Sequence, residues 1–330
     1  MSWRVSVLVA GLIVGCSEGP VTPPREQPDV DKEPPDEGEQ VQRDARAAAP
    51  LDASRTPDAT PSARDAVVPA EPDAREPTTS NEQDAGPLDS GAPSEPVSCD
   101  GKTGLKAGDT NASLMLGGQR RTYIVHVGSK VDGSKPVPLL LDFHPMLFGT
   151  ASSQRRSSGY AELADQEGFV VAYADGLDNA WNLGPCCTRS REVDDFALAL
   201  AMIETISNQT CIDEKRIYAA GYSNGGGLSH YLACKHADVF AAVSPAAFDL
   251  IEEVPCEPSR PISVISFRGT SDNIVPYAGG ASTPPTPYRL DPIHFLGAEG
   301  TFKKWAEIDG CKGQPISGAN GCQTYSQCEG

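Results

Sequence analysis

The sequence predicts an α/β fold with a mostly parallel sheet, helices on both faces of that sheet, and a disordered tail in front. Two observations support this prediction. Between residues 99 and 330, short apolar runs suited to strands alternate with helix-like stretches, which is typical of parallel sheets. In addition, the glycine-rich run at residues 221–225 lies between a strand-like and a helix-like segment, which indicates a tight strand-to-helix turn.

The individual elements follow from the apolar periodicity. Residues 122–127 alternate between polar and apolar, as in an edge strand, whereas residues 138–143 form a continuous apolar run suited to a strand that is buried on both faces. Further strands are expected at 168–173, 216–220, 240–244 and 262–267, and helices at 158–167, 194–207, 226–236 and 300–308.

The chain divides sharply near residue 98. Residues 17–98 contain no aromatic residue, 15 of the 29 prolines, and 19 acidic against 7 basic side chains. Such a segment buries too little apolar surface to offset its chain entropy. We therefore expect a disordered, acidic, Pro/Ala-rich linker at 16–98 and one folded domain at 99–330. The net charge of −18 argues against nucleic acid as a partner.

The N-terminus has the marks of a lipoprotein signal. One positive charge precedes a short apolar run, which ends in Leu-Ile-Val-Gly-Cys at residues 12–16. This ending resembles a bacterial lipobox, with residues 1–15 as the signal peptide and Cys16 as the lipidated residue; ordinary cleavage near Cys16 is the alternative. A three-chain lipid anchor would hold the protein stably on a membrane surface. We expect a secreted monomer, lipid-anchored to the bacterial cell surface or outer membrane.

The cysteines indicate disulfides. Ten cysteines together with a secretion signal favour an oxidising compartment. Setting Cys16 aside leaves nine, so either one thiol is free or its partner lies outside this sequence. Cys186 and Cys187 are expected to belong to two separate disulfides. No CxxC pair occurs and the five histidines are scattered, so no metal site is expected.

The turn at residues 221–225 carries the candidate chemistry. Its sequence, Gly-Tyr-Ser-Asn-Gly, matches the G-x-S-x-G nucleophile elbow. A serine hydroxyl is a weak nucleophile at neutral pH, so it needs a base, an acid that orients the base, and donors for the oxyanion. Ser223 is the predicted nucleophile. Asp272 is the predicted acid because it follows a buried-strand candidate on the loop that faces the elbow, although a turn-capping role is the alternative.

These residues resemble a known family. The stretches at 164–175, 181–195, 216–227 and 269–277 are together similar to the secreted polyhydroxybutyrate depolymerases and feruloyl esterases, relatives of carbohydrate esterase family one. The resemblance implies an α/β-hydrolase fold, Ser223 as nucleophile and Asp272 as triad acid. It also implies hydrolysis of a carboxylic ester through an acyl-enzyme, with no cofactor.

The oxyanion loop departs from that family. Its members usually carry His-Gly after the strand that shapes this loop, whereas this chain has His144-Pro145. Proline has no N–H, so the second oxyanion donor must be Met146 or Leu147, alongside Asn224. His144 is expected to be structural, with a substrate contact as the alternative. Arg268 stands where the family tends to have a histidine before Gly-Thr.

The catalytic base is the larger departure. In the family it follows the last strand, beyond the segment that matches residues 322–328. The only histidine after Asp272 here is His294. We expect the base to lie beyond residue 330; the alternatives are that His294 substitutes for it or that the protein is inactive. Of the other histidines, His126 is expected in a strand and His230 and His236 on the helix after the elbow.

One neighbouring motif has a plainer explanation. Asp194 and Asp195 resemble a catalytic carboxylate pair, but adjacent residues on a helix do not face each other across a substrate. We expect them to cap that helix and favour its dipole. The sequence thus predicts a serine esterase acting on polyhydroxybutyrate-type, feruloyl or acetyl esters, with a catalytically inactive binding protein of the same fold as the alternative.

Overall fold

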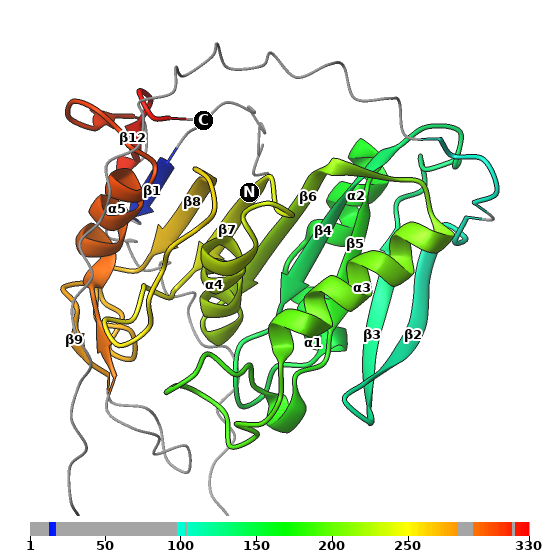
Figure 1. Cartoon of the computed structure of the whole chain (residues 1–330), viewed down its shortest axis with the longest axis horizontal. Helices are drawn as coiled ribbons and strands as arrows, with labels where there is room; N and C mark the ends of the chain where they lie inside the picture. The colour runs from blue at the N-terminus through cyan, green and yellow to red at the C-terminus, as the bar shows by residue number, and fades with distance from the viewer. Residues whose placement is uncertain (1–12, 18–97, 103, 283–292, 319–320, 330) are drawn as a thin grey trace, which may run out of the picture. The chain divides into compact units, whose positions relative to one another are not determined.

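Five neighbouring parallel strands form the centre of the sheet in the computed structural model of the chain (Figure 1). The structure describes residues 13–17, 98–102, 104–282, 293–318 and 321–329, with the backbone alone described at 13–17. The strand order is β11-β12-β1-β8-β7-β6-β4-β5-β3-β2. The central strands are β4 (Val137–Phe143), β5 (Val170–Ala174), β6 (Ile212–Tyr222), β7 (Ala242–Ala246) and β8 (Ser263–Arg268).

Antiparallel strands border this centre. On one side, β3 (Gln119–Val127) pairs antiparallel with β5, and β2 (Gly108–Leu116) forms a hairpin with β3. On the other side, β1 (Ile13–Ser17) runs parallel to β8 and antiparallel to β12 (Gln323–Tyr325), which also pairs with β11 (Ile316–Ser317). A separate small pair joins β9 (Gly280–Ala281) to β10 (His294–Phe295).

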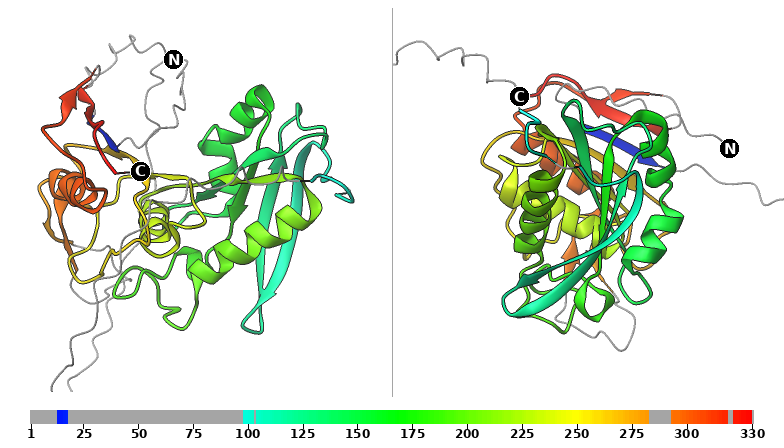
Figure 2. Two further views of the ribbon diagram at one scale, coloured as in Figure 1. Left: turned by 45° about the horizontal axis from the view of Figure 1, so that its top comes forward. Right: turned by 90° about the vertical axis from the view of Figure 1, so that its right-hand side faces the viewer.

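Helices cover both faces of the sheet (Figure 2). Helices α1 (Ala151–Ser157) and α2 (Tyr160–Glu167) lie on one face, over a small apolar cluster that includes Val171 and Tyr173. Helices α3 (Asp195–Gln209), α4 (Asn224–His236) and α5 (Gly297–Ile308) contribute to the larger core on the opposite face. A 3-10 turn, η1, spans Leu177–Asn179. The predicted α/β architecture is therefore confirmed.

Several elements differ from the sequence prediction, among them the short strands β1, β9, β10, β11 and β12, none of which was expected. Strand β2 was not expected, because its alternating residues are only half-buried and carry few strongly apolar side chains. The expected helix at 158–167 is α2, and the separate helix α1 precedes it. Gly159 divides the two helices because its φ of 75° lies in the left-handed region, which an α-helix cannot contain.

The predicted signal peptide and linker lie mostly outside the described residues. The described residues belong to one compact unit, Met1–Thr22 with Glu95–Gly330, and the second unit spans Pro23–Ser94. Most of the predicted signal at 1–15 and of the linker at 16–98 falls outside the described part. Strand β1 includes Cys16, but its pairing does not test lipidation, which stays a prediction. No helix within the described residues has the length and apolar character needed to cross a bilayer.

Disulfides fasten the folded part. Cys99 pairs with Cys211, Cys234 with Cys256, and Cys311 with Cys328. The fourth bridge joins the neighbours Cys186 and Cys187, so the prediction that these belong to two separate disulfides is wrong. The loop that carries them is closed by a hydrogen bond from the N–H of Leu183 to the carbonyl of Cys186. All nine cysteines from Cys99 to Cys328 are disulfide-bonded, so the predicted alternative of a free thiol among them is wrong.

Candidate active site

Ser223 occupies a strained turn between β6 and α4. Its φ of 53° and ψ of −125° are rare for a residue with a side chain. A Cβ atom at Gly221 would collide with the carbonyl of Gly225, and one at Gly225 would collide with the carbonyl of Phe143 on β4. The glycines therefore allow the strand, the helix and the neighbouring strand to meet at one point. This geometry is that of a nucleophile elbow, and the side chain of Ser223 is half-buried at the carboxyl end of the sheet.

The two predicted oxyanion donors lie just after the neighbouring strands β6 and β4. Asn224 is the first residue of α4, where a backbone N–H has no acceptor within the helix and the helix dipole favours negative charge. The second donor belongs to the loop at 144–149, which follows β4. The N–H of Leu147 already donates to the carbonyl of Asn179 at 3.0 Å. Met146 is therefore the better of the two predicted second donors.

His144 supports this loop. Its ring is fully buried, its Nε2 accepts the N–H of Gly176 at 3.0 Å, and its Nδ1 lies 2.8 Å from the carbonyl of Pro145, to which it donates. This pattern requires the neutral tautomer with the proton on Nδ1. Burial lowers the pKa of His144, which also favours the neutral ring. The expected structural role of His144 agrees with these contacts.

Asp272 lies in a turn four residues after β8. Its Oδ1 accepts the N–H groups of Ile274 and Val275 at 2.9 and 3.0 Å, which shapes the turn. These bonds engage one carboxylate oxygen, and within the described residues no hydrogen bond engages Oδ2. The contacts therefore fit both the turn-capping role and that of an acid holding a histidine through its second oxygen. Arg268, at the end of β8, points instead to the buried Asp249, with Nε donating to Oδ1 at 2.6 Å.

All five histidines of the sequence lie in the described residues, and none has a hydrogen bond or ion pair there with Ser223 or Asp272. His126, on β3, pairs with Asp109. His230 and His236 lie on α4 as expected, and the buried His230 accepts the indole N–H of Trp305. In this arrangement none of these three histidines contacts Ser223, so none is placed to act as its base.

His294 is also engaged elsewhere. It lies on β10, and its Nδ1 is 2.6 Å from Oε1 of Glu253. The hydrogen bond to Glu253 raises the pKa of His294, although both side chains are partly exposed to solvent. The structure thus joins His294 to Glu253 rather than to the predicted triad acid Asp272.

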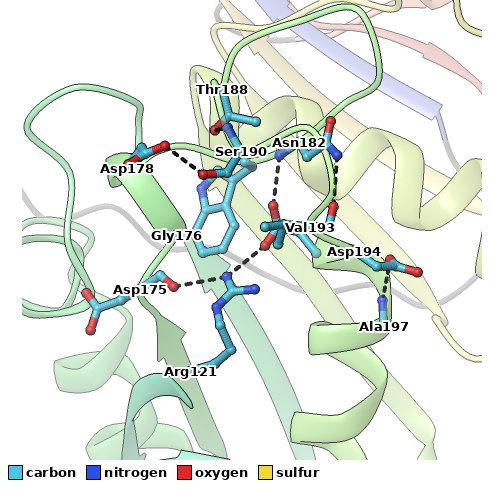
Figure 3. A network of polar contacts seen from close by, with 12 residues as sticks. Arg121, Asp175, Gly176, Asp178, Asn182, Thr188, Ser190, Val193, Asp194 and Ala197 are labelled. Atoms are coloured by element: carbon cyan, nitrogen blue, oxygen red, sulfur yellow. Dashed lines mark hydrogen bonds and ion pairs between the residues drawn. The ribbon is translucent and has the colours of Figure 1, made fainter. Parts of the chain in front are cut away.

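A buried ion pair behind the elbow was missed in the sequence. Asp194 is the N-cap of α3 as predicted, accepting the N–H of Ala197. Asp195 instead pairs with Arg121 of β3 at 2.7 Å, and both side chains are at most 2% exposed (Figure 3). Asp195 lies in the first turn of α3 as predicted, but its carboxylate pairs with Arg121 and makes no cap hydrogen bond to the helix. A signal was available, because strand alternation places Arg121 on the inward face with Tyr123, and a buried arginine needs a partner.

Within the described residues, no group of three or more histidine, cysteine, aspartate or glutamate side chains is arranged to hold a metal ion.

Comparisons with known proteins agree with this geometry. The model of the prolyl oligopeptidase family matches residues 156–249. The fold is that of an α/β-hydrolase. Feruloyl esterase B of Piromyces equi is 43% identical over 220 residues, which span 64% of this chain and 40% of that protein. The putative esterase NocK of Nocardia uniformis is 30% identical, over 53% of this chain and 52% of its own length.

Two further similarities are more distant. Feruloyl esterase C of Emericella nidulans is 26% identical over 64% of this chain and 71% of its own length. A thermostable esterase of known structure is 17% identical with a TM-score of 0.45, over 61% of this chain and 52% of that one. The chain spans about half the length of the first two curated relatives. The chain is therefore similar to curated esterases over 53% to 64% of its own length.

Proposed function

We propose that this protein is a serine carboxylic-ester hydrolase that works through an acyl-enzyme. The observation that carries the proposal is the elbow itself. Ser223 has the strained backbone of a nucleophile, and it is followed directly by the free N–H of Asn224 at the start of α4. The similarity to feruloyl esterases over 64% of the chain supports the same activity.

In the proposed reaction, the hydroxyl oxygen of Ser223 attacks the ester carbonyl while a histidine takes its proton. The N–H groups of Asn224 and Met146 bind the oxyanion of the tetrahedral intermediate. The histidine then gives the proton to the leaving alcohol, and water hydrolyses the acyl-enzyme in the same way. Asp272 orients the histidine through its second carboxylate oxygen. No step requires a cofactor.

The base is the open part of this mechanism. We propose that it comes from chain beyond residue 330, with His294 as the alternative. Hydrolysis of p-nitrophenyl acetate by residues 99–330 is compared with hydrolysis by a longer chain that continues into the natural downstream sequence. We expect the longer chain to be faster by at least 100-fold. Equal activity would contradict the proposal and move attention to His294, which His294→Gln then tests.

The substrate is proposed to be a feruloyl ester, in preference to the acetyl and polyhydroxybutyrate esters. Two exposed aromatic side chains are next to the proposed site in the chain. Tyr222 directly precedes the nucleophile and is 54% exposed, and Phe148 follows Met146 by two residues and is 90% exposed. Aromatic surfaces of this kind suit an aromatic acyl group. Methyl ferulate, an acetylated sugar and a 3-hydroxybutyrate trimer, compared by kcat/KM, test this order.

The nucleophile is tested directly. A fluorophosphonate probe should label wild-type protein, and Ser223→Ala should remove both the label and the turnover. Ser152→Ala is the matched control, because it removes an exposed hydroxyl on α1 and should change neither. If Ser223→Ala retains turnover, the serine mechanism is refuted.

A non-catalytic protein that binds ester-bearing polymer is the second candidate. The observation in its favour is that no histidine in the described part contacts Ser223 or Asp272. It predicts no fluorophosphonate label in any length of the chain, together with retained binding to a feruloylated glycan.

We also propose that lipid on Cys16 tethers the enzyme at the cell surface. Cys16→Ala should move the protein from the membrane fraction to the soluble fraction. Retention of this variant in the membrane fraction would contradict a lipid tether.

A further inference from the structure

Trp181 joins the two halves of the proposed oxyanion hole. It lies in the loop that follows η1 and precedes α3 in the chain, and its side chain is fully buried. Its backbone N–H donates to Oδ1 of Asn224 at 2.6 Å, and its carbonyl accepts from Nδ2 of Asn224 at 3.2 Å. The Asn224 side chain is therefore held at both ends, which fixes the residue whose backbone N–H is the first oxyanion donor.

The indole ring of Trp181 reaches the other half. Its Nε1 donates to the carbonyl of His144 at 2.8 Å, and its ring centroid lies 4.7 Å from that of His144 and 5.3 Å from that of Phe143. The His144 carbonyl also lies against the first turn of α4, where a Cβ on Gly225 would be 2.6 Å from it. Trp181 therefore holds the start of the loop that carries Met146 against the helix that carries Asn224.

The residue after Trp181 is anchored separately. The backbone N–H of Asn182 donates to Oδ2 of Asp195 at 2.8 Å, and its side-chain amide donates to the carbonyl of Arg191. The same amide donates to the carbonyl of Val193 (Figure 3). Asp195 in turn is paired with Arg121 through its other oxygen. These contacts come from β3 and α3, so the position of Trp181 is set by elements outside the elbow.

We propose that Trp181 is a positioning residue that sets the distance and orientation between the two oxyanion donors, Asn224 and Met146. The proposal rests on the esterase function proposed above. Oxyanion donors stabilise the transition state only when they are held in place before the reaction, and loss of one donor lowers kcat by about 100- to 1000-fold. A residue that holds both donors should therefore act on kcat far more than on KM.

The test is Trp181→Phe, which keeps an aromatic ring but removes the N–H that bonds to His144. The matched control is Trp305→Phe. Trp305 is equally buried and also donates its indole N–H to a buried acceptor, Nδ1 of His230, but it lies on α5. Both variants should lose stability. Only Trp181→Phe should lower kcat for methyl ferulate, by about 10- to 100-fold, with KM changed less than about twofold.

A second readout does not depend on turnover. In ¹⁵N NMR spectra of the whole chain, Trp181→Phe should shift the backbone amide signals of Met146 and Asn224, and Trp305→Phe should leave them in place. If the wild type proves inactive, the esterase proposal fails while this measurement still tests positioning. Unchanged Met146 and Asn224 signals, or equal kcat loss in both tryptophan variants, would overturn the inference.

A further variant guards against misfolding of Trp181→Phe. Asn224→Ala keeps the backbone donor but removes both side-chain bonds to Trp181. It should lower kcat to a similar degree. The double variant should be little slower than either single one, because the indole bond to His144 and the backbone bonds to Asn224 are the two ends of one link, and breaking either end releases it. Fully additive losses would show that the two residues act independently and would refute the proposed link.

Discussion

The raised pKa of the buried Asp142 predicts how the free energy of unfolding changes with pH. It lies on β4, two residues before His144, and it is 1% exposed. Its Oδ1 accepts from Nε2 of Gln154 at 2.8 Å, whereas Oδ2 has no hydrogen-bond partner among the described residues. Burial raises the pKa of Asp142 to about 7, against a usual value of 3.8, and the hydrogen bond from Gln154 offsets only part of this rise.

The sign of the pH effect follows from this direction. Between pH 4 and pH 7 the unfolded chain has released the Asp142 proton, while the folded protein still holds it. Stability therefore falls as pH rises through this window, by about 1.4 kcal/mol for each pH unit. From pH 5 to pH 8 the loss should be about 2 to 3 kcal/mol, since the folded group also ionises above pH 7.

The perturbation is Asp142→Asn, which keeps the shape and the acceptor for Gln154 but cannot ionise. Urea unfolding, followed by the fluorescence of the buried tryptophans at pH 5 and pH 8, measures the free energy of unfolding. Wild type should lose about 2 to 3 kcal/mol more than Asp142→Asn between the two pH values.

Asp309→Asn is the control for this measurement. Burial also raises the pKa of Asp309, but only to about 6, so its contribution should end at a lower pH. If wild type and Asp142→Asn lose the same stability between pH 5 and pH 8, Asp142 is already ionised in the folded protein and the reasoning is refuted.

Three further predictions concern the elbow, the buried ion pair and the Cys99–Cys211 disulfide. Gly225→Ala should lower the melting temperature and cut fluorophosphonate labelling at least tenfold, because its methyl group collides with a carbonyl of β4; unchanged labelling would contradict this. Arg121→Met should destabilise by about 3 to 5 kcal/mol in urea, since it leaves Asp195 buried without a partner, and adding Asp195→Leu should restore most of the loss. Replacing Cys99 and Cys211 by serine should cost about 3 to 5 kcal/mol, because this bridge closes a separation of 112 residues; an unchanged denaturant midpoint would argue against it.

The sequence predicts β4 and β5 well because these two buried strands are nearly continuous apolar runs. Strand β4 and helix α4 lie within two residues of their expected ends. Strand β2 was missed because an edge strand buries only one face and carries little apolar signal. Helix α1 was missed because its seven residues, Ala151–Ser157, are mostly polar and depend on the capping box at Thr150.

The site residues likewise fall into two groups, those that local sequence motifs indicate and those that depend on contacts between distant parts of the chain. Ser223 and Asp272 could be proposed from the sequence because each belongs to a motif of residues close by in the chain, and their catalytic roles stay predictions. The Arg121 and Asp195 pair joins residues 74 apart, and the Trp181 contact with Asn224 joins residues 43 apart. One sequence without a fold gives no means of bringing such partners together. The Cys186 and Cys187 bridge was missed for another reason, since adjacency was taken to favour separate partners.

Two opposite devices set the oxyanion geometry. Gly225 allows β4 and α4 to approach, because any side chain there would meet the carbonyls of Phe143 and His144. Trp181 then holds the same carbonyl of His144 from the other side through its indole N–H. Gly225 leaves room for the His144 carbonyl because it has no side chain, and Trp181 holds the same carbonyl through a hydrogen bond. The distance between the donors therefore depends on this one carbonyl, so a substitution on either side of it should reach the chemistry without touching the substrate.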